Sequence, residues 1–131
     1  MSEIINPQDA ELEEIILGSC LIESKAITLI ADILRPEAFY NEKNLEIYAT
    51  LQSMYRNGQK IDIITVKEEL ARRGKLEFIG GPYTLAHISG RVASSAHLEY
   101  HARILKQKYI RRETILGFHK LLALAADCLL Y

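Results

Sequence analysis

Residues 61–81 read Ile61-Asp-Ile-Ile-Thr-Val-Lys-Glu-Glu-Leu-Ala-Arg-Arg-Gly-Lys-Leu-Glu-Phe-Ile-Gly-Gly81, a capped helix followed by a double-glycine turn. Thr65 precedes Glu68 by three residues, which is the reciprocal spacing of a capping box, so we expect the helix to begin at Thr65. The arginines at 72–73 fall where cations meet the carbonyl end of a helix. Gly74 can take the left-handed conformation that closes it. The stretch therefore predicts a short, well-delimited helix in the middle of the chain.

Helical patterns extend over most of the remaining sequence. Asn6 followed by Pro7 predicts a first helix, because an N-cap side chain before a proline is a common helix start. Acidic residues then favour the positive end of that helix: Asp9, Glu11, Glu13 and Glu14. Further helices are expected over residues 24–34, 44–56 and 82–90, which are bounded by proline or glycine.

The last and longest helix is expected over residues 95–131. No proline interrupts them, and only Gly117 weakens the pattern, by about 1 kcal/mol relative to alanine. The second half, residues 115–131, is apolar nearly all round, so it needs burial on more than one side. A membrane span requires about twenty uninterrupted apolar residues, and His119 and Lys120 interrupt this run. We therefore favour contact with another protein helix and expect no membrane partner.

A repeat of four and three residues runs along this helix and is typical of a two-helix packing seam. It comprises Ile104, Lys108, Arg111, Ile115, Phe118, Leu122, Ala125 and Leu129. The alternative is that these residues pack into the core of the same chain. Both interpretations hold if the first half of the helix packs on the rest of the chain and the second half projects to meet another helix. The sequence thus predicts an all-α protein, with a compact head of about five helices over residues 1–94 and a long helix over residues 95–131.

Composition limits the classes of function. The 131 residues carry 16 lysines and arginines against 17 aspartates and glutamates, and the net charge of −1 does not favour a domain built mainly to hold nucleic acid. Cys20 and Cys128 lie far apart without a CxxC motif, so we expect both to be small buried apolar residues in a reducing compartment. The first residues lack the basic and apolar regions of a signal peptide. We therefore expect a cytoplasmic protein.

His97 and His101 are four residues apart and can face a metal ion from one helical turn. With Glu99 they define the catalytic alternative, a small metal hydrolase. The zinc-protease motif places glutamate directly after the first histidine, however, and this chain has Leu98 there. Because no third ligand follows nearby, structural or surface histidines are the favoured interpretation, and we expect no metal site.

One concentration of basic residues occurs, on the first half of the long helix: Arg103, Lys106, Lys108, Arg111 and Arg112. Such residues can contact DNA phosphates or an acidic partner. The alternative is a solvated helix face balanced by acidic neighbours such as Glu99 and Glu113. We favour the solvated face and keep the contact with DNA or an acidic partner as a hypothesis.

Four blocks, read in order, carry a resemblance to a known family. Residues 61–81 fit the pattern D-x-x-T-V-x-x-x-L-x-x-x-G-x-L-x-x-x-G-G. The other blocks are Leu12-Glu-Glu-Ile-Ile-Leu-Gly-Ser-Cys-Leu-Ile22, Pro36-Glu-Ala-Phe-Tyr40 and Ser94-Ser-Ala-His-Leu-Glu-Tyr-His-Ala-Arg-Ile104. Together they resemble the N-terminal domain of bacterial replicative DNA helicases of the DnaB type. The resemblance extends over residues 7 to 112.

This resemblance implies a function in DNA replication. In the family, the domain pairs through helical hairpins, and three pairs form a trimer-of-dimers collar on the hexameric helicase ring, which acts on single-stranded DNA. The collar also receives the C-terminal helical domain of primase and, in some bacteria, communicates with the helicase loader. The chain is thus expected to self-associate, to dock primase and to meet a loader. The alternative is a stand-alone helicase-like fragment that modulates the hexamer.

The resemblance also implies contact residues. Residues 109–131 correspond to the first arm of the hairpin, so the pairing seam is expected at Ile115, Phe118, Leu122 and Leu129. The family often reads G-G-x-x-Y-L near its primase surface. Here the tract is Gly80-Gly81-Pro82-Tyr83-Thr84-Leu85, and threonine stands at the usual tyrosine position. Tyr83 and Thr84 are therefore the candidate primase contacts.

Catalysis in the family belongs to a RecA-like domain with a phosphate-binding loop, G-x-x-x-x-G-K-[ST]. In this chain Leu76 follows Gly74-Lys75, and Pro82 follows the glycines at 80–81, so neither tract fits. We expect no catalytic residue and no cofactor in this segment, from which the ATPase domain is absent. ATP and magnesium are expected for the parent helicase.

Overall fold

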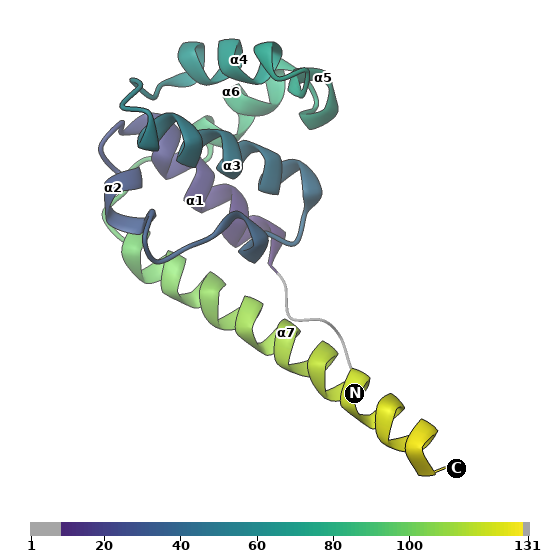
Figure 1. Ribbon diagram of the computed structural model, residues 1–131. Coiled ribbons are helices and arrows are strands. Elements are labelled where there is room, and N and C mark those ends of the chain that lie inside the picture. Colours follow the sequence, from purple (N-terminus) through teal and green to yellow (C-terminus); the bar gives the residue numbers. More distant parts are fainter. Residues whose placement is uncertain (1–8, 130–131) are drawn as a thin grey trace.

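The computed structural model describes residues 9–129, and within them the backbone is helical without a β-strand (Figure 1). The elements in chain order are α1 (Ala10–Ile22), α2 (Ile27–Ile30), the 3-10 turn η1 (Pro36–Ala38), α3 (Glu42–Arg56), α4 (Ile63–Arg72), α5 (Leu76–Ile79), α6 (Pro82–Gly90) and α7 (Leu98–Leu129). The elements from α1 to α6 form a compact head, from which α7 extends. The prediction of an all-α fold with a long C-terminal helix is confirmed.

The start of α4 differs from the predicted one. Asp62 accepts a hydrogen bond from the backbone N–H of Thr65 at 2.8 Å, and the Thr65 hydroxyl accepts one from the N–H of Asp62 at 2.9 Å. The capping box therefore lies three residues earlier than expected. The prediction that Thr65 begins the helix with Glu68 as its partner is wrong, because the carboxylate of Asp62 already satisfies the free N–H group at this helix end.

Other boundaries also move. The side chain of Asp9 caps α1 by accepting from the N–H of Leu12 at 3.0 Å, while Asn6 and Pro7 lie outside the described residues. The helix predicted over residues 24–34 is wrong in extent, since only α2 is α-helical there and turns flank it. Neither η1 nor α5 has a counterpart in the sequence prediction. The helix predicted at residues 82–90 is confirmed as α6.

The core is centred on α1, which contacts α3, α6 and α7. Ile16, Leu17 and Cys20 on this helix are completely buried. Gly18 lets α1 approach α6 closely, because a Cβ at this position would lie 2.6 Å from the carbonyl oxygen of Ile88. This close contact holds α6 in a fixed position against the first helix.

A buried carboxylate connects α1 to the start of α3. From the sequence, Glu13 is expected to place a negative charge at the N-terminal end of α1, yet its side chain is fully buried. It accepts hydrogen bonds from the N–H of Tyr40 at 2.6 Å and from the side-chain amide of Asn44 at 3.0 Å. Because hydrogen bonds satisfy this buried charge, Glu13 orders the chain between η1 and α3.

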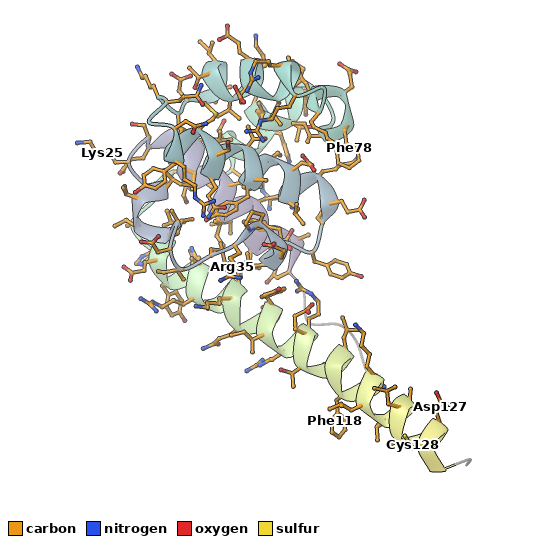
Figure 2. All side chains as sticks on the ribbon, viewed as in Figure 1. Lys25, Arg35, Phe78, Phe118, Asp127 and Cys128 are labelled. Carbon is orange, nitrogen blue, oxygen red and sulfur yellow. The ribbon has the colours of Figure 1, made fainter. Side chains whose placement is uncertain are left out.

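The helix α7 lies on the head only along its first half, where it contacts α1, α2 and η1. The contact ends at Arg112, which is 5% exposed and whose Nη2 donates to the carbonyl oxygen of Ala38 at 3.1 Å. Its guanidinium lies 5.2 Å from the ring centre of Tyr40 and 5.5 Å from that of Tyr109. We call these four residues the Arg112 clamp. Beyond it, α7 projects away from the head (Figures 1 and 2).

Although α7 is long, no helix within the described residues combines enough length and apolarity to cross a membrane.

Candidate functional site

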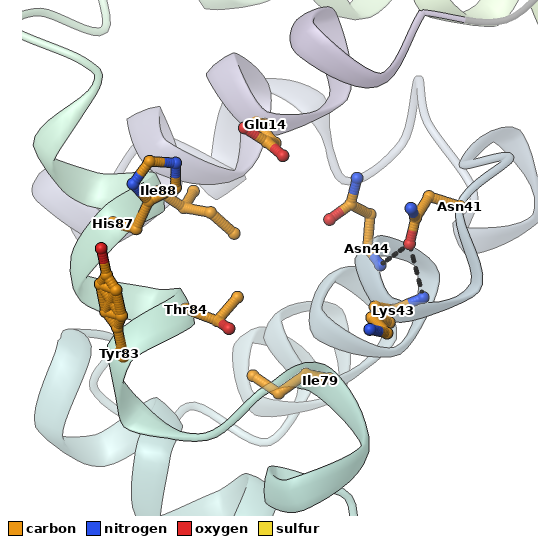
Figure 3. A pocket seen from close by; sticks show the side chains of 9 residues that line it. All are labelled: Glu14, Asn41, Lys43, Asn44, Ile79, Tyr83, Thr84, His87 and Ile88. Atoms are coloured by element: carbon orange, nitrogen blue, oxygen red, sulfur yellow. Dashed lines mark hydrogen bonds between the residues drawn. The ribbon is translucent and has the colours of Figure 1, made fainter.

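A pocket of about 330 Å³ opens on the head between α1, α3, α5 and α6 (Figure 3). We call it the Tyr83 pocket. Ile79 and Ile88 are buried and form its apolar part, whereas the other side chains are mostly polar or aromatic. Its lining comprises Glu14, Asn41, Lys43, Asn44, Ile79, Tyr83, Thr84, His87 and Ile88. Both candidate contacts named from the sequence, Tyr83 and Thr84, thus lie in one pocket.

The double glycine sets the direction in which α6 leaves α5. Gly80 and Gly81 have φ angles of +108° and +80°, which side chains other than glycine rarely adopt. Pro82 then occupies the first turn of α6, where its missing N–H costs nothing. The turn leaves Tyr83 71% exposed at the rim, while Thr84 is half-buried and faces the pocket (Figure 3).

Charged groups stand on opposite sides of the pocket. Glu14 lies on α1, where its carboxylate pairs with Arg91, and Lys43 lies across from it on α3. Asn41 holds the start of α3 by accepting from the N–H of Lys43 at 2.8 Å. His87 is one helical turn after Tyr83, and the two rings lie 6.1 Å apart. The pocket offers charge, hydrogen bonds and an aromatic rim, which suits recognition of another protein.

Sequence reasoning did not find Glu14, Lys43 or His87 as pocket residues. Glu14 reads as one of several acidic residues at a helix start, and Lys43 reads as an ordinary surface lysine. Only the packing of α1, α3 and α6 brings them together. No local motif in the sequence signals this arrangement.

The projecting part of α7 presents large apolar side chains to solvent. Phe118 is 64% exposed and Leu122 is 54% exposed, whereas Ile115 is half-buried. These three residues belong to the predicted seam. The fourth, Leu129, ends the helix, and its side chain lies outside the described residues.

A second apolar line runs along α7, outside the predicted seam but largely within the run of residues 115–131 that is apolar nearly all round. It consists of Leu121 and Leu124 on the projecting half, both more than half exposed, with Ile110 on the same line but before Arg112. At about 100° per residue, this line lies about 110° around the helix from the seam. The projecting half therefore has two apolar faces, and one neighbouring helix can cover only one of them.

The basic residues of α7 do not form one surface. Arg103 pairs with Glu99 at 2.8 Å, and Lys106 and Arg111 are exposed. Lys108 is half-buried, and Arg112 is buried in its clamp. Arg112 therefore does not belong to an exposed basic group, because its guanidinium is held by Ala38, Tyr40 and Tyr109.

The two histidines of the metal hypothesis lie near the start of α7. The ring centres of His97 and His101 are 6.3 Å apart. The carboxylate of Glu99 bonds to Arg103 instead. Across the part of the chain that the structure describes, no group of three or more potential metal ligands occurs. The geometry does not support the metal hydrolase alternative.

Comparison with known proteins gives a consistent result. Residues 5–107 match the family model described as DnaB-like helicase N terminal domain. The chain is 43% identical over 108 residues to the replicative DNA helicase DnaB of Rhodothermus marinus, which covers 82% of this chain and 12% of that protein. It is 34% identical over 119 residues to the replicative DNA helicase DnaC of Bacillus subtilis, with 88% and 26% covered. The chain thus spans about a quarter or less of the length of these curated relatives.

Solved structures show the same relationship. The N-terminal domain of DnaB helicase from Mycobacterium tuberculosis superposes with a TM-score of 0.86 at 31% sequence identity, covering 91% of this chain and 86% of that one. A DnaB-like replicative helicase, whose structure was determined together with its interactions with primase, superposes with a TM-score of 0.77 at 28% identity. That alignment covers 91% of this chain and 28% of the larger one.

Proposed function

This chain belongs to the DnaB-like helicase N-terminal domain family, and from that premise we propose that it acts in the collar of a replicative DNA helicase. The matched domain is the non-catalytic one, without the ATPase. We propose two tasks for it: association of helicase subunits through α7 and docking of primase at the Tyr83 pocket. A single observation carries the first task, namely the two exposed apolar faces of the projecting half of α7.

Exposing these apolar faces to water is energetically unfavourable. Burying one leucine side chain contributes roughly 1.5–3 kcal/mol, so covering Phe118, Leu121, Leu122 and Leu124 together provides a substantial driving force for association. Two faces require two neighbours. We propose that the seam of Ile115, Phe118, Leu122 and Leu129 pairs with another subunit, as in dimers that build a trimer of dimers. The second line then faces the other arm of a hairpin.

The association is tested with a charge placed on the seam. We expect Leu122→Asp to shift the chain towards monomers in multi-angle light scattering, because a buried unpaired carboxylate is costly at such a contact. Ala123→Asp is the matched control, since it adds an acidic charge at an exposed position of the same helix that lies about 110° around from the seam. An unchanged mass for Leu122→Asp at every concentration would refute the seam.

Primase docking is supported by the position and chemistry of the Tyr83 pocket. Exposed tyrosines at the rim of a pocket are frequent anchors of protein interfaces. The related helicase whose structure shows its interactions with primase supports the same class of partner. We propose that Tyr83 and Thr84 contact the C-terminal helical domain of primase, with Lys43 and His87 at the edge.

Docking is tested by calorimetry with that primase domain. We expect Tyr83→Ala to weaken binding by at least about tenfold, the effect of losing a modest interface anchor. Tyr100→Ala is the control, because Tyr100 is 65% exposed but lies on α7, outside the pocket. Equal affinities for the two variants would exclude Tyr83 as a contact and leave the association through α7 unaffected.

The remaining features of the proposal concern the parent helicase. We propose that it hydrolyses ATP with magnesium in a separate domain, moves along single-stranded DNA and acts in the cytoplasm. A helicase loader is a further partner in this proposal. The exposed cations Arg103, Lys106 and Arg111 and the half-buried Lys108 are available for a transient contact with DNA, whereas Arg112 is not.

A further inference from the structure

A second hollow, of about 260 Å³, lies where the head meets α7. One side is formed by the segment of residues 32–38, which joins α2 to η1, and the other by Lys106, Tyr109 and Ile110 of α7. Figure 2 shows Arg35 at this junction. We call it the α2–α7 groove. It shares no residue with the Tyr83 pocket, which is built from α1, α3, α5 and α6.

The groove combines an apolar floor with cations on both banks. The apolar side chains that an occupant can reach are Ile33 and Tyr109, which are half-buried, and Ile110, which is 51% exposed. Leu34 and Ala38 also line the groove but are buried. Arg35 on the head and Lys106 on α7 are exposed and line opposite sides. Among the described residues, neither forms an ion pair or a side-chain hydrogen bond. The acidic residue of the groove, Asp32, forms none with them either.

We propose that the α2–α7 groove docks an acidic segment of another protein, which places an apolar side chain on the floor and carboxylates at Arg35 and Lys106. Two unpaired cations on facing banks favour an anionic occupant. The apolar floor of Ile33, Tyr109 and Ile110 favours a side chain over a phosphate chain, which has no apolar group to bury.

The α2–α7 groove shares residues with the Arg112 clamp, which fixes the direction of α7. Ala38 and Tyr109 line the groove, and both also hold the Arg112 guanidinium. An occupant therefore rests against two of the four residues of the Arg112 clamp. This surface is separate from the proposed primase site, so its test does not depend on primase.

The binding is measured by fluorescence anisotropy with a short labelled peptide that alternates glutamate with leucine and phenylalanine. We expect the full chain to bind it, and Arg35→Glu or Lys106→Glu to weaken binding by at least about tenfold, the effect of losing one charge-assisted hydrogen bond. Arg111→Glu is the matched control, because it makes the same charge change on α7 outside the groove. Protection from hydrogen exchange is expected in residues 32–38.

Several results would overturn the proposal. Equal loss of binding in all three variants would indicate a general charge effect, as would equal binding of a peptide with lysine in place of glutamate. Competition by oligothymidylate that depends on Arg35 and Lys106 would assign the groove to nucleic acid. A change in oligomer mass on Arg35→Glu would assign it to a second copy of the chain. Tyr83→Ala should leave peptide binding unchanged, so a failure here and a failure of primase docking are distinguishable.

Discussion

At the scale of single residues, the two cysteines have opposite environments. Cys20 is fully buried in α1, and this burial raises the pKa of its thiol to about 12. Cys128 is exposed near the end of α7. Because the thiolate is the reactive form, the two side chains should differ widely in alkylation rate.

We therefore predict that a maleimide modifies Cys128 within minutes at neutral pH, whereas Cys20 reacts only when the protein unfolds. Mass spectrometry of the Leu122→Asp variant checks this, since that variant should keep α7 free of a neighbour. Cys128→Ala is the control and should remain unmodified in the native state. Native-state labelling of Cys20 at a comparable rate would contradict its burial.

Residue identity alone reveals only part of such environments. A reading of both cysteines as small buried apolar residues holds for Cys20 and is wrong for Cys128, which is exposed. Likewise, Arg112 is indistinguishable in the sequence from Arg111, yet one is buried and the other exposed. Burial depends on which side of α7 faces η1, and that follows from packing over more than seventy positions of separation.

At the scale of elements, α4 depends on the capping box of Asp62 and Thr65. The hydrogen bond from the backbone N–H of Thr65 is the main reason why the pKa of Asp62 lies below its usual 3.8. A carboxyl group with a lowered pKa in the folded state stabilises the protein above its unfolded pKa. That contribution is lost as the pH falls through the folded value.

We predict that acidification below about pH 4 lowers the melting temperature of the native chain more than that of Asp62→Asn. The asparagine keeps an acceptor for the cap but does not titrate. Circular dichroism melts across this pH range make the comparison. Asp32→Asn is the control, because Asp32 is exposed and accepts no hydrogen bond among the described residues. Parallel melting curves for the native chain and Asp62→Asn would contradict the role of this carboxylate.

The sequence predicts long elements better than short ones. α3, α6 and α7 follow from their periodic apolar residues and from the glycines and prolines that bound them. η1 and α5 span three and four residues, too few for a periodic pattern to show. The cap of α4 was misplaced because Asp62 and Thr65 are both good caps, and only their hydrogen bonds identify which one begins the helix.

At the scale of the whole molecule, the Arg112 clamp sets how α7 leaves the head. We predict that Arg112→Met, which keeps an apolar stem but removes the guanidinium, allows α7 a wider range of directions. Spin labels at Cys128 and at an introduced Lys60→Cys report the distance across the molecule by double electron–electron resonance. The distance distribution should broaden in Arg112→Met and stay narrow in Arg111→Met. Equal widths would show that other contacts fix the helix.

Of the surfaces described above, only the apolar half of α7 could be predicted in full, because it depends on local composition alone. The exposed apolar side chains in the second half of α7 follow from a run of sequence that is apolar nearly all round. The Tyr83 pocket was only half predicted, since Glu14 and Lys43 enter it from helices distant in sequence. The α2–α7 groove was not predicted, because Arg35 and Lys106 meet only after α7 folds back onto α2.

The clamp has a mechanical consequence. From Arg112 to Leu129, α7 extends about 25 Å as a single rod, at about 1.5 Å per residue. With Arg112 as the fulcrum, a rotation of about 10° displaces the far end sideways by about 4 Å, roughly half of the 8–10 Å that separates the axes of two packed helices. The helix therefore acts as a lever, because a small rearrangement around Ala38 and Tyr109 becomes a sideways shift of several ångströms at its tip.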